Sequence, residues 1–323
     1  MRTAPTTSNA DEMPVSQRPP SEPSLPIAIS RAKSRTMTGK APNIGVLLVE
    51  CPYRPGVVAE VADTLNRHGA SLLDSAQHRD VAGGRFFQRI RFDLAKPDAR
   101  DLLEQGLREI ANEFQMTWRI SYSDRVPRIA VFASKLEHCL YDLLIRHRTG
   151  ELPCKFALII SNHPDTRPIA EHFNVPFHHL PVTPSTKAAQ EAAAIELLEH
   201  AGIELIVLAR YMQILSPEFV ERYHAQIINV HHSFLPAFIG ANPYRQAHDK
   251  GVKMIGATSH YVTSELDQGP IIEQTTIRCS HADSIEDLVR KGRDLEKQVL
   301  AAAVRWHLED RILVHQSKTI VFE

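Results

Sequence analysis

At 323 residues the chain is longer than one usual domain, and its 43% hydrophobic residues are enough for two packed cores. The formal net charge is −1 at pH 7 and the basic residues are spread along the chain, so we expect no nucleic-acid partner. No apolar run approaches the roughly 18 residues that span a bilayer, which predicts no membrane partner. The four cysteines lie far apart, a pattern typical of neither a disulfide framework nor a zinc site, and we expect a cytoplasmic protein.

Residues 1–42 are rich in Ser, Thr and Pro and poor in large apolar side chains. Such a segment cannot bury enough surface to offset the entropy lost on ordering, so we expect a disordered tail. Basic residues outnumber acidic ones here, as in a transit peptide, but no amphipathic stretch supports that alternative.

Residues 43–124 have the pattern of a small ferredoxin-like α/β unit. Strands are predicted at 44–50, 71–79, 85–94 and 116–123, and helices at 57–68 and 98–114, which gives the order βαββαβ. This order, with the phrase LLVECPYRPGVVAEVADTLNRHGASLLD at 47–74, resembles the ACT domain. That resemblance implies a regulatory domain with an amino-acid effector and a homo-oligomer, a dimer or tetramer. Tyr53 and Arg54 occupy the polar part of the first turn, which leaves open a dimerisation unit without a ligand.

From residue 125 to the end, strands and helices alternate, which predicts an open, mostly parallel, Rossmann-like sheet covered on both faces. In such sheets ligands bind beyond the carboxyl ends of the strands. The expected strands are 128–134, 156–161, 177–180, 205–209, 227–230, 254–262 and 271–277, and the expected helices are 136–148, 166–172, 186–200, 217–224, 243–250 and 284–308.

The stretch IINVHHSFLPAFI at 227–239 carries the first candidate site. Its β-branched start predicts a buried strand, and proline ends the strand's pairing. Alternation places Asn229, His231 and Ser233 on one face and His232 on the other. An amide, an imidazole and a hydroxyl are therefore expected to converge where the strand ends.

Two loops add candidates. Asp267, in the turn Asp-Gln-Gly-Pro, is an acid that can face Asn229 and His231 and hold the tautomer of a histidine. The loop 134–138 has no glycine, so it is not expected to wrap a phosphate. His138 in that loop either lines the site or only begins a helix.

At these residues the chain resembles the catalytic domain of folate-dependent formyltransferases. The resemblance is carried by Asn229-Val230-His231, the following SFLP and the Asp267-x-Gly-Pro-Ile-Ile turn, and by ISNHPD (160–165), PFHHLPVT (176–183), LARYMQILSP (208–217) and IGATSHYVT (255–263). It implies a catalytic trio of Asn229, His231 and Asp267. The implied folate-binding residues are Met212, Gln213, Ile214, Leu215 and His260.

The phrases are most similar to the members of that family that release the formyl group to water. The implied reaction converts 10-formyltetrahydrofolate and water to formate and tetrahydrofolate, and it supplies formate for purine synthesis and balances one-carbon folate pools. The folate is the substrate, and no cofactor or metal is implied.

Other functions stay open on the sequence alone. A transferase acting on an amine acceptor shares the trio, and a non-catalytic folate or amino-acid sensor would need only the binding units. Transferase relatives often carry a lysine where this chain has Ala237-Phe238-Ile239, and we expect Lys135 and Glu137 to fill the acceptor's place. A serine hydrolase would need a G-x-S-x-G turn around Ser233, and a zinc enzyme would need a motif such as H-E-x-x-H.

Overall fold

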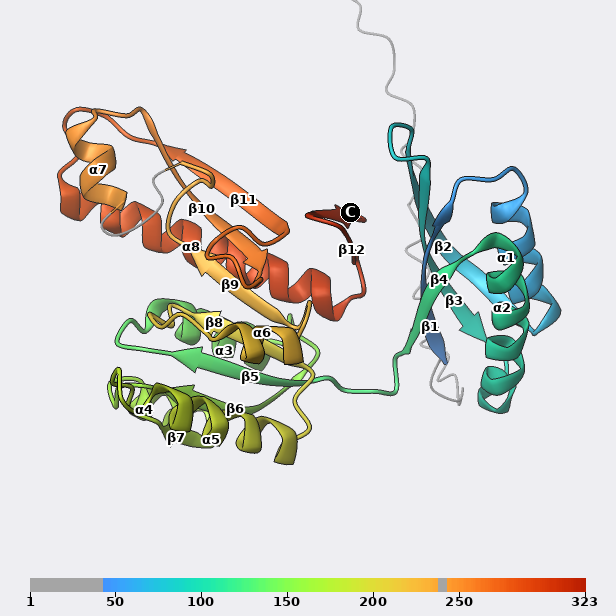
Figure 1. Cartoon of the computed structure of the whole chain (residues 1–323), viewed down its shortest axis with the longest axis horizontal. Helices are drawn as coiled ribbons and strands as arrows, with labels where there is room; N and C mark the ends of the chain where they lie inside the picture. Colours follow the sequence, from blue (N-terminus) through green and yellow to red (C-terminus); the bar gives the residue numbers. More distant parts are fainter. Residues whose placement is uncertain (1–42, 238–242) are drawn as a thin grey trace, which may run out of the picture. The chain divides into compact units, whose positions relative to one another are not determined.

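Two β-sheets follow each other along the chain, one within residues 44–122 and one within 128–278 (Figure 1). The computed structural model describes residues 43–237 and 243–323. The predicted disordered tail, residues 1–42, and residues 238–242, with Phe238 and Ile239, lie outside the described residues. The predicted α/β fold is confirmed, whereas the division of the chain into domains at residues 42 and 124 stays a prediction.

The first sheet has four antiparallel strands in the order β2-β3-β1-β4, with two helices on one face. Gly56 begins the first helix at φ 92°, a left-handed conformation that glycine adopts without a steric penalty. The predicted βαββαβ order is present as β1 (Ile44–Pro52), α1 (Val57–Arg67), β2 (Ala70–Asp80), β3 (Arg85–Leu94), α2 (Arg100–Phe114) and β4 (Thr117–Tyr122), with a short 3-10 turn at Pro97–Ala99.

The second sheet has seven strands in the order β11-β10-β9-β8-β5-β6-β7. Strands β9, β8, β5, β6 and β7 are parallel, and β10 is antiparallel to both of its neighbours. The chain runs outward from β5 to β7 and then returns to β8 on the other side of β5, so a topological switch point lies between β5 and β8. The strands are β5 (Arg128–Ala133), β6 (Lys155–Ser161), β7 (Phe177–His179), β8 (Leu205–Ala209), β9 (Ile227–His231), β10 (Met254–Tyr261) and β11 (Ile271–Arg278).

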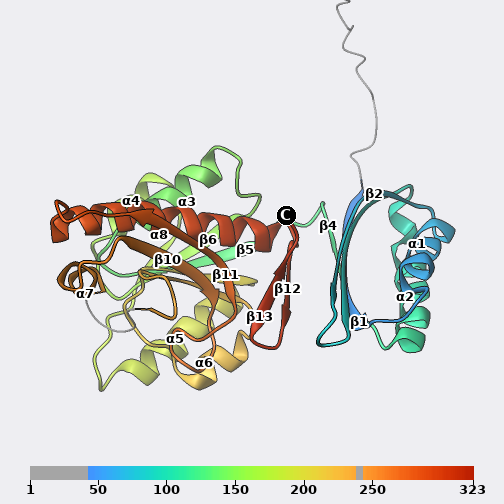
Figure 2. The same ribbon diagram turned by 90° about the horizontal axis from the view of Figure 1, so that it is seen from above.

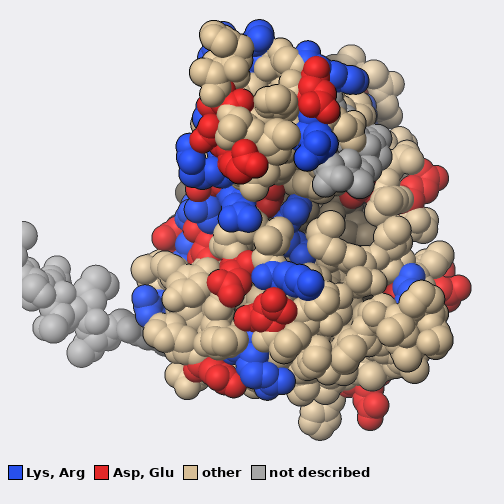
Figure 3. Space-filling model, turned by 90° about the vertical axis from the view of Figure 1, so that its left-hand side faces the viewer, with Lys and Arg blue, Asp and Glu red and all other residues tan. Residues whose placement is uncertain are grey.

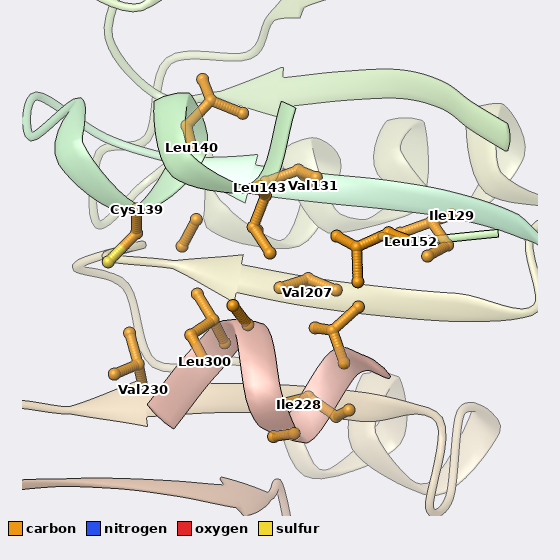
Figure 4. Close-up of a cluster of buried hydrophobic side chains, with 14 of the residues drawn as sticks. Ile129, Val131, Cys139, Leu140, Leu143, Leu152, Val207, Ile228, Val230 and Leu300 are labelled. Carbon is orange, nitrogen blue, oxygen red and sulfur yellow. The ribbon is translucent and has the colours of Figure 1, made fainter. Parts of the chain in front are cut away.

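Helices cover both faces of this second sheet (Figure 2). One face packs against α3, α4 and α8, and Figure 4 shows part of that core, including Val131, Val207 and Leu300. The other face packs against α5 and α6 through Phe132 and Phe219. Successive strand residues alternate between the two cores, as a pleated strand requires. The helices are α3 (His138–Arg148), α4 (Arg167–His172), α5 (Lys187–His200), α6 (Pro217–Arg222), α7 (Pro243–Asp249) and α8 (Ile285–Leu308).

The chain ends in a hairpin of β12 (Ile312–His315) and β13 (Lys318–Val321). Phe322, which follows it, forms a small buried cluster with Leu48 and Phe87 of the first sheet. The guanidinium of Arg89 donates hydrogen bonds to the carbonyl oxygens of Glu309 and Asp310, both at 2.9 Å. The short strand-like end that the sequence predicts after α8 therefore packs against the first sheet.

Acidic and basic side chains are interspersed on the face that Figure 3 shows, next to a broad uncharged area. Within residues 43–237 and 243–323 no helix has the length and apolar character needed to cross a membrane.

Candidate active site

A cavity of about 670 Å³ lies beyond the carboxyl ends of β8 and β9, next to the switch point of the second sheet. It is lined by all the residues predicted as the trio or as folate-binding, which come from four separate parts of the sequence. Strand β9 supplies Asn229 and His231, the turn after β10 supplies Asp267, β10 itself supplies His260, and the loop after β8 supplies Met212, Gln213, Ile214 and Leu215.

His231 and Asp267 form the central pair of the cavity. Nδ1 of His231 lies 3.1 Å from Oδ2 of Asp267; the His231 side chain is buried, and that of Asp267 is 10% exposed. The other ring nitrogen of His231, Nε2, is also buried and finds no hydrogen-bond partner among the described residues. A buried nitrogen without a partner loses its hydration free energy, so an unpaired atom at this position is a cost that needs an explanation.

Burial by itself would raise the pKa of Asp267, but the hydrogen bond from His231 and the nearby ring of His260 outweigh burial and lower the pKa well below its ordinary value. The carboxylate therefore stays ionised at neutral pH. An ionised carboxylate on Nδ1 fixes the tautomer of His231 and stabilises its imidazolium form.

Asn229 is oriented by His260. Nδ1 of His260 lies 2.8 Å from the backbone carbonyl of Tyr261, which can only accept, so Nδ1 carries a proton. In the neutral ring Nε2 then accepts, and the Nδ2 amide of Asn229 donates to it over 3.3 Å. One N–H of the Asn229 amide remains for a ligand. Asn229 lies on the same strand as His231.

The turn that carries Asp267 depends on a close approach of two backbones. A Cβ atom on Gly269 would lie 1.7 Å from the carbonyl oxygen of Tyr261, so only glycine fits. The Tyr261 N–H donates to the Pro270 carbonyl at 2.9 Å, and Asp267 has φ 58°. The register of β10 against β11 shifts between Ser259 and His260, a local irregularity of the kind that redirects side chains at active sites.

The loop after β8 presents apolar side chains to the cavity. Met212 is 59% exposed and Ile214 is 61% exposed, whereas Leu215 is buried. Large apolar side chains left exposed at a cavity are suited to the face of a flat ring. The Met212 N–H donates to Oγ of Ser134 at 3.0 Å, so this backbone donor is already satisfied within the protein.

A second polar cluster in the cavity wall was missed by sequence reasoning. The carboxylate of Glu296, on α8, is 1% exposed. Its Oε2 lies 2.7 Å from Nε2 of His138 and 3.4 Å from Nε of Arg210, and its Oε1 accepts a hydrogen bond from the Tyr244 hydroxyl at 2.7 Å. Burial alone would raise the pKa of Glu296, but His138, Arg210 and Tyr244 lower it below its ordinary value. The sequence held one signal for this cluster, which is that Glu296 is an acid among the apolar positions of the helix predicted at 284–308.

Two expectations about the strand exit are wrong. The strand ends at His231, so strict alternation stops there, and His232 lies in the cavity wall with its ring centroid 5.1 Å from that of His231. Ser233 does not line the cavity, because its hydroxyl donates to the carbonyl of Ala237 at 2.7 Å.

The expectation that Lys135 and Glu137 fill the acceptor's place is also wrong. Both side chains are exposed to solvent and neither lines the cavity. Their neighbours Leu136 and His138 do line it, because α3 begins at His138 and turns that face of the loop inward. Of the two readings of His138, the structure supports the one in which it lines the site.

One group of side chains within the described parts of the chain has the geometry of a metal site. The ligand atoms of His138, Cys139 and Glu296 all lie within 4.8 Å of one another. However, both oxygens of Glu296 already accept hydrogen bonds, and burial raises the pKa of the Cys139 thiol well above its ordinary value. A metal ion would have to displace these donors and deprotonate a buried thiol.

We therefore expect the purified protein to carry no stoichiometric zinc or iron. Exhaustive chelation should leave both its Tm and its turnover unchanged, because the group that could hold a metal is already satisfied by protons and hydrogen bonds. Metal analysis and thermal unfolding with and without a chelator measure this. A Tm lowered by chelation and restored by one particular metal would contradict it.

Comparison with known proteins bears on the same residues. A sequence model described as formyl transferase matches residues 127–304. A formyltetrahydrofolate deformylase from Synechocystis sp. is 50% identical over 281 residues, which cover 85% of this chain and 97% of the relative. A solved structure of a formyltetrahydrofolate deformylase from Pseudomonas syringae pv. tomato has a TM-score of 0.85 at 46% identity, and the match covers 89% of this chain and 96% of that one.

The second sheet also resembles proteins that transfer a formyl group. A solved structure of a glycinamide ribonucleotide transformylase from Symbiobacterium toebii has a TM-score of 0.59 at 30% identity, and the match covers 62% of this chain and 97% of that one. The match to the deformylases extends over most of the chain at higher identity. The chain belongs to the formyltetrahydrofolate deformylase family.

Proposed function

We propose that the chain hydrolyses 10-formyltetrahydrofolate to formate and tetrahydrofolate with Asn229, His231 and Asp267 as its catalytic residues. The observation that carries this assignment is the buried, unpartnered Nε2 of His231 in a cavity that also holds Asn229 and the ionised Asp267. The formyl group on a folate nitrogen resembles an amide, so water attack places negative charge on its oxygen. A site for this reaction needs donors for that charge and an acceptor for a water proton.

The geometry supports a separate role for each residue of the trio. The free N–H of Asn229 and Nε2–H of protonated His231 donate to the developing oxyanion, and one such donor is worth roughly 3 kcal/mol in the transition state. The Oδ2 atom of Asp267 holds His231, while Oδ1, which is 3.7 Å from the nearest ring nitrogen of His260, stays available to orient the attacking water and accept its proton.

All proton transfers of the proposed reaction then take place between the trio, the attacking water and the folate nitrogen. The C–N bond breaks as the folate nitrogen takes the proton from Nε2 of His231, and the proton that Asp267 accepted from water restores the imidazolium. Formic acid ionises to formate on release. No group outside the trio has to change its protonation state.

The exposed side chains of Met212 and Ile214 support a place for the pterin ring, with His260 behind the trio as the residue that orients Asn229. We place the enzyme in the cytoplasm, where it would supply formate for purine synthesis and balance one-carbon folate pools. We propose that no cofactor takes part, and that the folate is the substrate.

We also propose that the first sheet is an ACT-like unit through which the chain forms a homo-oligomer, a dimer or tetramer, with an amino acid as possible effector. Strand β2 is an edge strand, and Leu72 and Leu73 on it are 42% and 51% exposed. An exposed apolar edge strand is normally covered by pairing.

Replacement of Asn229, His231 or Asp267 by alanine should each lower kcat roughly a hundredfold, because each removes a group that acts on the transition state. Ser233→Ala is the matched control, since its hydroxyl lies outside the cavity, and its rate should stay near that of the parent. Formate release and thermal unfolding are measured for each variant. Near-parent turnover in a folded His231→Ala protein would refute the assignment.

Hydrolysis and transfer are separated by their products. We expect formate and tetrahydrofolate to appear in a one-to-one ratio, and glycinamide ribonucleotide neither to speed folate consumption nor to become formylated, because the loop 134–138 offers no glycine backbone for its phosphate. Product analysis with and without that amine measures this. A formylated amine that forms faster than formate would make the chain a transferase.

Leu72→Lys combined with Leu73→Lys in the full-length chain should lower the mass of the assembly, because two charges would repel across a paired edge. Leu102→Lys, at an exposed site of α2, is the control and should leave the mass unchanged. Sedimentation velocity gives the mass. A double variant that keeps the parent's mass would show that β2 is not the interface.

A further inference from the structure

The cavity wall next to the trio carries Arg210, a residue in an unusual backbone conformation. Arg210 leaves β8 with φ 60°, in the left-handed region that favours glycine. Its side chain is only 9% exposed, and its Nε atom has no hydrogen-bond partner among the described residues, although Oε2 of Glu296 is 3.4 Å away. A long charged side chain at such a position costs conformational and desolvation free energy, so its presence needs a reason.

The side chain of Arg210 lines the cavity and is paired with the buried carboxylate of Glu296 at 3.4 Å. The same carboxylate takes hydrogen bonds from His138 and Tyr244, at 2.7 Å each. Arg210, His138, Tyr244 and Glu296 all line the cavity that holds the trio. We call these four residues the Glu296 cluster.

The Glu296 cluster is continuous with the catalytic histidine. The ring centroids of His231 and His232 are 5.1 Å apart, and those of His232 and Tyr244 are 6.0 Å apart. Burial first, and then the positive charge of Arg210, lower the pKa of His232 to about 4, so this ring is neutral at pH 7. The Glu296 cluster therefore forms the cavity wall on the His232 side of the trio.

Fold alone does not explain why water is the acceptor. Proteins named for formyl transfer to glycinamide ribonucleotide share this sheet, and Lys135 and Glu137 do not enter the cavity. Transfer differs from hydrolysis only in the nucleophile: an amine nitrogen bonds to the formyl carbon, the C–N bond to folate breaks, and the amine's proton ends on the folate nitrogen. The choice thus depends on which nucleophile has room beside the trio.

We propose that Arg210, held by Glu296, is a specificity-determining residue that fills the space an amine acceptor would need and leaves room for water only. This proposal rests on the proposed hydrolysis at the trio. It adds the reason why the reaction accepts water and no amine. The guanidinium does not touch the reacting atoms. Its removal should widen the cavity without removing any group of the trio.

The test compares Arg210→Gly with the parent chain. Glycine adopts φ 60° without strain, and Glu296 keeps its hydrogen bonds from His138 and Tyr244, so this variant is expected to fold. The substrate is 10-formyltetrahydrofolate with glycinamide or hydroxylamine as the amine probe. The measured quantity is the ratio of formylated amine to formate, which we expect to rise about tenfold or more, as when a pocket admits a larger group.

Two further variants make the result decisive. Arg210→Asn, a residue that tolerates the left-handed conformation, should raise the same ratio if the glycine variant fails to fold. Lys135→Ala removes an exposed charge of the neighbouring loop and should leave the ratio unchanged. A structural role for Arg210 would lower stability or total turnover but would not move the ratio.

The outcomes also separate this proposal from the proposed function. A parent chain that releases no formate would defeat the proposed hydrolysis itself. A parent that releases formate, together with folded Arg210 variants whose product ratio equals the parent's, would overturn the role of Arg210 and leave hydrolysis at the trio intact.

Discussion

The hydrogen bond between Nδ1 of His231 and the carboxylate of Asp267 is the interaction on which the site depends. It joins the end of β9 to a turn that follows another strand, so it forms only if β9 and β10 pair in the right register. That turn can close only because Gly269 lies against the Tyr261 carbonyl, where any side chain would collide. Backbone packing thus places the Asp267 carboxylate on Nδ1 of His231 and leaves Nε2 without a hydrogen-bond partner among the described residues.

The cavity holds two acids, Asp267 and Glu296, in contrasting surroundings. Both have a pKa below the ordinary value, although burial acts against this in each case. Glu296 accepts hydrogen bonds at both oxygens and is thereby held as a fixed part of the wall. Asp267 is bonded closely at one oxygen and retains capacity at the other, which is what a group that handles water requires. Both carboxylates are ionised, so their hydrogen-bond partners, and not their charges, distinguish Glu296 in the cavity wall from Asp267, the proposed base.

Sequence reasoning succeeded where the signal is local and failed where it depends on distant packing. A strand was predicted at 227–230 because β-branched residues precede a proline, and the Asp267 turn was predicted because its Asp, Gly and Pro have strong turn preferences; the observed strand is Ile227–His231. His232 was assigned to the wrong side because alternation was carried past the end of the strand. The only local sign of Glu296 was an acid among the apolar positions of a long helix, and Tyr244 gave none, since the two residues meet only after α7 and α8 pack together.

The sequence by itself determined the order of strands and helices and the resemblance to formyltransferases, because periodicity, turn residues and short motifs lie within a few residues of one another. The candidate trio is what that resemblance implies. Only the tertiary structure decided which side chains meet: that Asn229 donates to His260, that Nε2 of His231 lacks a partner among the described residues, and that Arg210 lines the cavity whereas Lys135 does not. These facts depend on strand register, a left-handed backbone position and helix packing. All three are set by contacts between residues far apart in the chain.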